Sequence, residues 1–166
     1  MSGTTVVRAI MLVATIVWAW AEVLKIRRPG QVEPARRLWT VALALTLVHA
    51  ALAFDVKYHW SHEAALMDTA RRTAAVTGMV WGGGIFVNDL FLMLWLADAL
   101  WWWIAPVAYV RRPVPLERTR SVLFLFMFVN GAVVFASNIA RAVGIPSVAA
   151  VCVAWVLDGR RHTARA

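Results

Sequence analysis

Long apolar runs dominate this chain, and the links between them carry most of its charge. Hydrophobic residues make up 61% of the 166 residues, whereas soluble domains have roughly 45–50% apolar residues. A chain of this composition cannot bury all its apolar surface within itself, so we expect lipid around it. The sequence therefore predicts an all-α fold, a polytopic membrane helix bundle formed by residues 1–166 as a single integral membrane domain.

The apolar runs define the expected crossings. A helix needs about 20 residues to cross the hydrocarbon core. The last run is short for a crossing, and Gly144-Ile145-Pro146 is expected to separate it from the run before. We expect five transmembrane helices, with four as the alternative if the last run is tilted or half inserted. The expected spans are residues 4–25, 38–56, 80–105, 121–143 and 147–157.

Basic residues set the expected orientation, because they mark the cytoplasmic side of a membrane. The links at residues 25–37 and 111–120 contain five and four basic residues, each with one acidic residue. The link at residues 55–78 balances three basic residues with three acidic ones, so it belongs outside. We expect a chain in the plasma (inner) membrane with its amino terminus outside and its carboxyl terminus cytoplasmic.

The same charge pattern bears on two other classes of protein. A net charge of +8 would suggest a nucleic-acid partner in a soluble protein. Here the positive charge lies in links between spans, so we expect no nucleic acid. A cleaved signal peptide is also disfavoured, because only Arg8 precedes the first apolar core while Lys25, Arg27 and Arg28 follow it. We expect a retained first helix.

The outer link contains the pattern Asp55-x-x-x-His59-x-x-His62. If the second helix continues past Asp55, steps of four and three place all three side chains on one stripe. Imidazole and carboxylate ligands on one stripe suit copper or zinc, and open coordination positions would allow chemistry. Glu63 lies four residues after His59 and could replace Asp55 as the oxygen ligand. The pattern predicts a metal site at the outer face.

A different local structure would remove this metal site. Ser61 could be the N-cap of a new helix, with Glu63 in its first turn. The two histidines of the link would then be interfacial residues on an amphipathic outer-face segment. Asp68 could pair with Arg71 and Arg72, which follow it by three and four residues, and these ion pairs would stabilise the segment. Gly78 would end it.

Within the spans, His49 is the candidate cofactor-binding residue. Asp89 falls at a similar depth, so we expect His49 to pair with Asp89 or a neighbouring asparagine, as hydrogen-bonding contacts between helices. A haem held by this chain alone is disfavoured, because no second histidine lies in a span. A single ligand to a pigment, or a site completed by another subunit, stays open. The ten tryptophans fit interfacial belts or the core without a cofactor.

Two further acidic residues, Glu22 and Asp98, fall toward the expected cytoplasmic end. Charged groups within a bilayer are costly, so they are expected to be paired or to carry function. The basic residues that could neutralise these two carboxylates are Lys25, Arg27, Arg28 and Arg111.

Two classes of function follow. The first is a small integral membrane subunit or scaffold of a larger membrane complex, docking through its helices and its outer-face link. Its partners would be the lipid bilayer and other membrane protein subunits, with a homo-oligomer as a further candidate. The second is a copper- or zinc-binding redox or relay protein. We favour the first, because the sequence contains no complete catalytic set, and whether the chain is an enzyme is left open.

Overall fold

The structure is a computed structural model that describes residues 3–28, 30–136 and 138–163, with the backbone alone for residues 159–163. All regular structure in this part of the chain is helical, which confirms the expected all-α fold. The elements are α1 (Gly3–Arg27), α2 (Val32–Tyr58), α3 (His62–Thr77), α4 (Gly84–Ile104), α5 (Pro106–Val110), α6 (Val114–Val129), the π-helix η1 (Asn130–Val134) and α7 (Asn138–Thr163).

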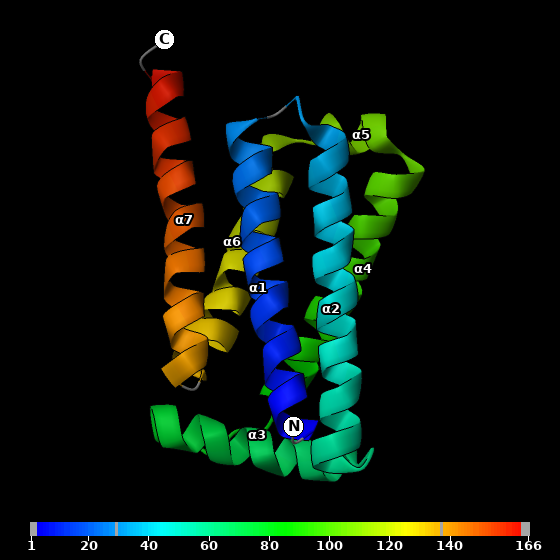
Figure 1. Ribbon diagram of the computed structural model, residues 1–166, viewed down its shortest axis with the longest axis vertical. Coiled ribbons are helices and arrows are strands. Elements are labelled where there is room, and N and C mark those ends of the chain that lie inside the picture. The colour runs from blue at the N-terminus through cyan, green and yellow to red at the C-terminus, as the bar shows by residue number, and fades with distance from the viewer. Residues whose placement is uncertain (1–2, 29, 137, 164–166) are drawn as a thin grey trace.

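The long helices run side by side between the two ends of a bundle, and α3 lies across one of those ends (Figure 1). We call this end the α3 end. The opposite end, which we call the arginine end, holds the turn between α1 and α2 and the segment around α5 (Figure 1). The amino terminus lies at the α3 end and the carboxyl terminus at the arginine end (Figure 1).

Four helices are long and apolar enough to cross a membrane: α1, α2, α4 and α7 over residues 138–158. Their length and composition fit a polytopic integral membrane protein. The helix α6 has 16 residues and continues directly into η1, so the pair also extends from the arginine end to the base of α7 (Figure 1). Beside the four long apolar helices, the bundle therefore contains one further helical segment, α6 with η1, which we call the α6–η1 column.

The helix break expected at residues 144–146 is wrong. The helix α7 begins at Asn138 and continues through Pro146, and the chain leaves helical structure earlier, at residues 135–136. Gly144 has a different role from a helix breaker, because a Cβ atom there would lie 2.1 Å from the backbone oxygen of Ala132 in η1. The glycine thus allows α7 to approach η1 closely.

The connection between η1 and α7 is closed by an arginine. The Arg141 side chain donates from Nε to the carbonyl oxygen of Val133 at 2.8 Å and from Nη2 to that of Val134 at 3.0 Å. The last carbonyls of a helix have no partner within the helix. Arg141 therefore satisfies two of these acceptors while joining α7 to η1.

Aromatic side chains form the core between α1, α2, α4 and α6. Trp18 of α1 stacks on Phe128 of α6, with ring centroids 3.8 Å apart. Trp95 of α4 lies 5.2 Å from Trp39 of α2 and 5.1 Å from Phe124 of α6. These five rings are almost fully buried. Trp39 therefore belongs to the core, although its place in the sequence also fitted an interfacial belt.

The close approach at Gly144 can be tested with a matched pair of glycines. Gly144→Ala should destabilise the bundle by about 1–3 kcal/mol, the usual cost of overpacking. Gly131→Ala should be neutral or slightly stabilising, because a Cβ there meets nothing within 4 Å and alanine favours helix. Thermal unfolding of the two purified variants in one detergent checks this, and equal effects would contradict the described contact.

Candidate functional site

The predicted metal pattern lies at the turn between α2 and α3. The helix α2 ends at Tyr58, and His59 and Trp60 both have a left-handed backbone, with φ of 48° and 60°. Ser61 is the N-cap of α3, and its hydroxyl accepts a hydrogen bond from the amide of Ala64 at 3.1 Å. The N-cap interpretation of the sequence is confirmed. The second helix does continue past Asp55, but it ends at Tyr58 and therefore does not include His59 and His62.

Two of the candidate metal ligands, Asp55 and His62, make other contacts at this turn. Asp55 accepts a hydrogen bond from the indole Nε1 of Trp60 at 3.0 Å. The ring of His62, at the start of α3, packs 5.4 Å from that of Phe54 and 6.4 Å from that of Phe86. Within the described residues, no group of three or more His, Cys, Asp or Glu side chains is placed to hold a metal ion. Metal binding stays a prediction for Asp55, His59, His62 and Glu63.

Asp68 joins α3 to the end of α2. Its carboxylate accepts hydrogen bonds from the Tyr58 hydroxyl at 2.9 Å, from Nε of Arg72 at 2.8 Å, and from Nζ of Lys57. Nη2 of Arg71 lies 3.5 Å from Oδ1 of Asp68. The predicted pairing of Asp68 with both arginines is confirmed, and Gly78 ends the helix as expected. Lys57 and Tyr58 add the contact that fixes α3 across the bundle.

His49 connects α2 to α1 rather than to α4. Its Nδ1 lies 2.9 Å from the carbonyl oxygen of Val7, so the ring makes a contact between helices of the expected kind with an unexpected partner. Asp89 shows no hydrogen bond or ion pair with any described residue. A cofactor-binding role for His49 stays a prediction.

The most unusual chemistry lies at the arginine end, where an ion pair is buried between α1 and α6. Glu22 is 2% exposed and Arg120 is 8% exposed. Arg120 Nη1 donates to Oε1 of Glu22 at 2.8 Å, and Nη2 donates to Oε2 at 3.4 Å. A fork-like contact of this kind is among the stronger hydrogen-bonding arrangements. It joins residues that lie 98 positions apart in the chain.

Further charges complete what we call the ion cluster: Glu22, Lys25, Arg112, Glu117 and Arg120. Arg120 Nη2 also donates to Oε1 of Glu117 at 2.8 Å. Lys25 Nζ lies 3.6 Å from Oε1 of Glu22 and 3.5 Å from Oε1 of Glu117. Arg112 Nε donates to Oε2 of Glu117 at 2.6 Å. Two carboxylates are thus shared among three cations.

Aromatic rings surround these cations. Lys25 Nζ lies 5.0 Å from the ring centroid of Trp39 and 5.5 Å from that of Trp102. The guanidinium of Arg120 is 4.9 Å from the same Trp39 ring. Cation–π contacts are strongest where water is excluded. The rings therefore help to stabilise charges that have left water.

Tyr109 of α5, which is itself buried, connects the ion cluster to Asp98 of α4. Its hydroxyl donates to Asp98 of α4 at 2.9 Å, and its ring stacks on Trp102 with centroids 4.5 Å apart. The guanidinium of Arg112 lies 3.7 Å from the Tyr109 ring. Burial, together with the charge of Asp98, raises the pKa of Tyr109 above its usual range. The phenol therefore stays protonated as the donor to Asp98.

Sequence reasoning found only part of the ion cluster. It placed Lys25 near Glu22, which is confirmed, but it missed Arg120 and assigned no hydroxyl donor to Asp98. The missed signal was positional: Arg120 directly precedes the apolar run that begins at residue 121. That place puts it at the same end of the bundle as Glu22.

Comparison with known proteins yields no relative: no family model, no curated protein sequence and no solved structure matches this chain.

Removing one member of the buried pair should be costly. Glu22→Gln leaves Arg120 without a full counter-charge, and we expect a loss of about 3–5 kcal/mol in the free energy of unfolding. Glu33→Gln is the matched control: Glu33 is exposed and paired with Arg36 and Arg37, so its loss should cost at most about 1 kcal/mol.

A double replacement separates charge from packing. Glu22→Leu combined with Arg120→Leu should recover much of the lost stability, because it removes both charges together. Thermal unfolding in detergent measures all the variants. If Glu22→Gln behaved like Glu33→Gln, the ion cluster would have no structural role.

The attachment of α3 should depend on pH through Asp68. Burial raises the pKa of Asp68, but hydrogen bonds from Lys57, Tyr58 and Arg72 outweigh it and lower the pKa from 3.8 to about 2. The attachment should thus be complete above about pH 4 and be lost as the pH falls through about 2.

A spin label at Ala75→Cys, on a Cys152→Ser background, reports the mobility of α3. The label should become mobile only at the acid end of this range. With Asp68→Asn it should already be mobile at neutral pH and should not respond to acid. Release of α3 between pH 5 and 7 in the unaltered chain would contradict the assignment.

Proposed function

We propose that this chain is a subunit or scaffold of a larger membrane complex. In this proposal it crosses the bilayer five times, with the α6–η1 column as one crossing. The α3 end lies outside and the arginine end lies in the cytoplasm, because basic residues are retained on that side. The described termini at opposite ends of the bundle support an odd number of crossings (Figure 1).

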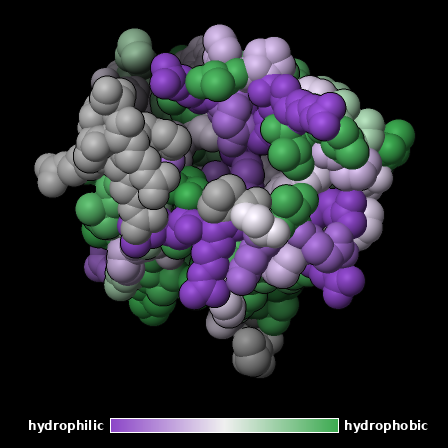
Figure 2. All heavy atoms as spheres, turned by 90° about the horizontal axis from the view of Figure 1, so that it is seen from above, coloured by the Kyte–Doolittle hydropathy of each residue, from purple (hydrophilic) through white to green (hydrophobic). Residues whose placement is uncertain are grey.

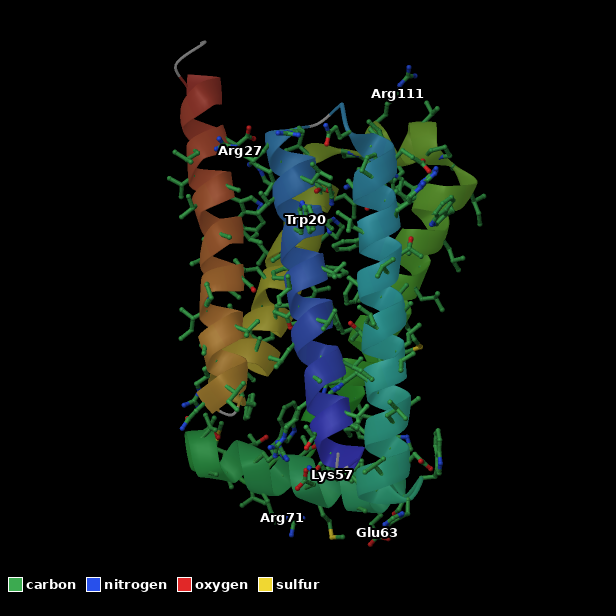
Figure 3. The ribbon with its side chains drawn as sticks, viewed as in Figure 1. Trp20, Arg27, Lys57, Glu63, Arg71 and Arg111 are labelled. Carbon is green, nitrogen blue, oxygen red and sulfur yellow. The ribbon has the colours of Figure 1, made fainter. Side chains whose placement is uncertain are left out.

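The observation that carries the proposal is a shallow depression on α3. It measures ≈ 350 Å³ and is lined by Met67, Ala70, Arg71, Ala74 and Val80. Arg71 and Glu63 point away from the bundle (Figure 3), which places the Arg71 side of α3 opposite the spans. This depression therefore faces away from the hydrocarbon core.

The apolar side chains of the depression are exposed on that outward face. Met67 is 52% exposed and Val80 is 83% exposed. Contiguous apolar surface that meets water commonly marks a site of protein association. The charged group of Arg71 at the rim would supply polar contacts around an apolar centre, which is the usual anatomy of an interface.

The adjoining turn presents a tryptophan. Trp60 is 66% exposed, and Asp55 holds its indole by the hydrogen bond described above. Left-handed backbone at a residue other than glycine costs roughly 1–2 kcal/mol. His59 and Trp60 therefore both lower the stability of the fold. Strain of this kind often accompanies function, and tryptophan is enriched among residues that dominate binding energy.

Photo-crosslinking from two matched methionine positions tests this proposal. Benzoyl-phenylalanine at Met67 should give a discrete protein cross-link in native membranes. The same group at Met93, exposed on the span α4, should react with lipid alone. Ala74→Trp, which fills the depression, should abolish the cross-link, whereas Ala97→Trp on α4 should leave it intact.

The mass of the cross-linked product identifies the partner class. A mass of twice the chain indicates a homo-oligomer, and any other discrete mass indicates a different subunit. Absence of a protein cross-link at Met67, or one that survives Ala74→Trp, would contradict docking at this depression.

A further inference from the structure

A second depression lies at the arginine end, between the start of α2 and α5. It measures ≈ 320 Å³ and is lined by Val32, Pro106, Val107, Val110 and Arg111. We propose that this depression binds an anionic phospholipid, with the phosphate on Arg111 and the glycerol and upper acyl chains on the valines. This inference is independent of the docking proposed at α3.

The position of the depression suits a lipid. It lies where α2 begins and α4 ends, and the side chains of Val107 and Val110 that line it are exposed. Ile104 and Val114, on either side of α5 in the sequence, are also exposed. Figure 2 views this end, where hydrophilic residues gather with hydrophobic ones between them. Such a mixture is typical of the boundary between headgroups and acyl chains.

The charge balance at this end favours an anionic ligand. The acidic side chains that the structure describes near these arginines already have partners within the chain. Glu22 and Glu117 belong to the ion cluster, Glu33 pairs with Arg36 and Arg37, and Asp98 accepts from Tyr109. At this end, three exposed arginines form no ion pair with a described carboxylate, namely Arg28, Arg111 and Arg118.

Arg111 differs from its neighbour Arg112 in direction. Arg112 is turned inward, with its Nε bonded to Glu117 and its guanidinium over Tyr109. Arg111 extends away from the end of the bundle (Figure 3). Its planar guanidinium is therefore free to bind a phosphate with two parallel hydrogen bonds. The ion cluster thus fixes α5, which in turn places Arg111 beside the apolar lining.

The apolar lining favours a phospholipid over free phosphate. Inorganic phosphate could contact Arg111 but would leave the valines exposed, whereas a phospholipid covers both. A basic residue near the surface strengthens binding of an anionic membrane by about 1 kcal/mol, which corresponds to about fivefold in affinity. The depression should therefore prefer phosphatidylglycerol to phosphatidylcholine of the same acyl composition by about this factor.

Native mass spectrometry of the purified full chain measures this preference. The unaltered chain should retain phosphatidylglycerol about fivefold more strongly than phosphatidylcholine. Arg111→Gln should abolish the difference, and Val107→Asp should weaken binding of both lipids. Arg118→Gln is the matched control, because it removes the same charge at the same end without lining the depression. The unfolding temperature of each variant confirms that the bundle remains folded.

Each other outcome overturns the proposal. Equal losses for Arg111→Gln and Arg118→Gln would mean that lipid is held by net charge rather than at this depression. Competition by millimolar inorganic phosphate would mean that a free anion, not a lipid, is the ligand. Equal retention of the two lipids by the unaltered chain would mean that the depression has no preference for an anionic headgroup.

Discussion

The buried ion pair between Glu22 and Arg120 constrains how α1 and α6 can pack, because either charge left alone between these helices would be costly. Removing two charges from water is costly, and a buried pair repays that cost only when its geometry and additional hydrogen bonds are good. Here Glu117 supplies further hydrogen bonds to Arg120, and the ring of Trp39 covers the guanidinium. The pair joins α1 to α6, a helix of 16 residues whose first half is charged.

The two ends of the bundle consequently have different character. At the arginine end, the acidic side chains Glu22, Glu33, Asp98 and Glu117 have partners within the fold, whereas Arg28, Arg111 and Arg118 form no ion pair with a described carboxylate. At the α3 end, Asp68 fastens an amphipathic helix across the bundle and leaves apolar side chains on its outer face. A bundle that binds lipid at one end and a protein partner at the other, as we propose, would be suited to the role of a scaffold.

Much of the fold could be predicted from the sequence, because apolar length and charged links report directly on lipid exposure. Local rules also located the capping of α3 by Ser61 and its end at Gly78. They failed at Gly144. In the local sequence this glycine is typical of a helix break, but in the structure it allows α7 to approach η1 closely, which only the three-dimensional packing reveals. They also missed Arg120, because pairing between helices depends on rotation about each helix axis. The candidate metal ligands do not share one helical stripe, because the predicted stripe required a continuous helix. The helix α2 instead ends at Tyr58, and His59 and Trp60 have a left-handed backbone.

The measurement that tests the central claim most directly is the sidedness of the two ends of the α6–η1 column. Single cysteines at Arg118 and at Ile139, on a Cys152→Ser background, can be labelled with a membrane-impermeant maleimide in intact cells and in inverted vesicles. The account predicts that Ile139→Cys reacts from outside and Arg118→Cys only from the cytoplasmic side. If both positions react from the same side, the column does not cross the membrane, and the five-crossing bundle built around Glu22 and Arg120 is wrong.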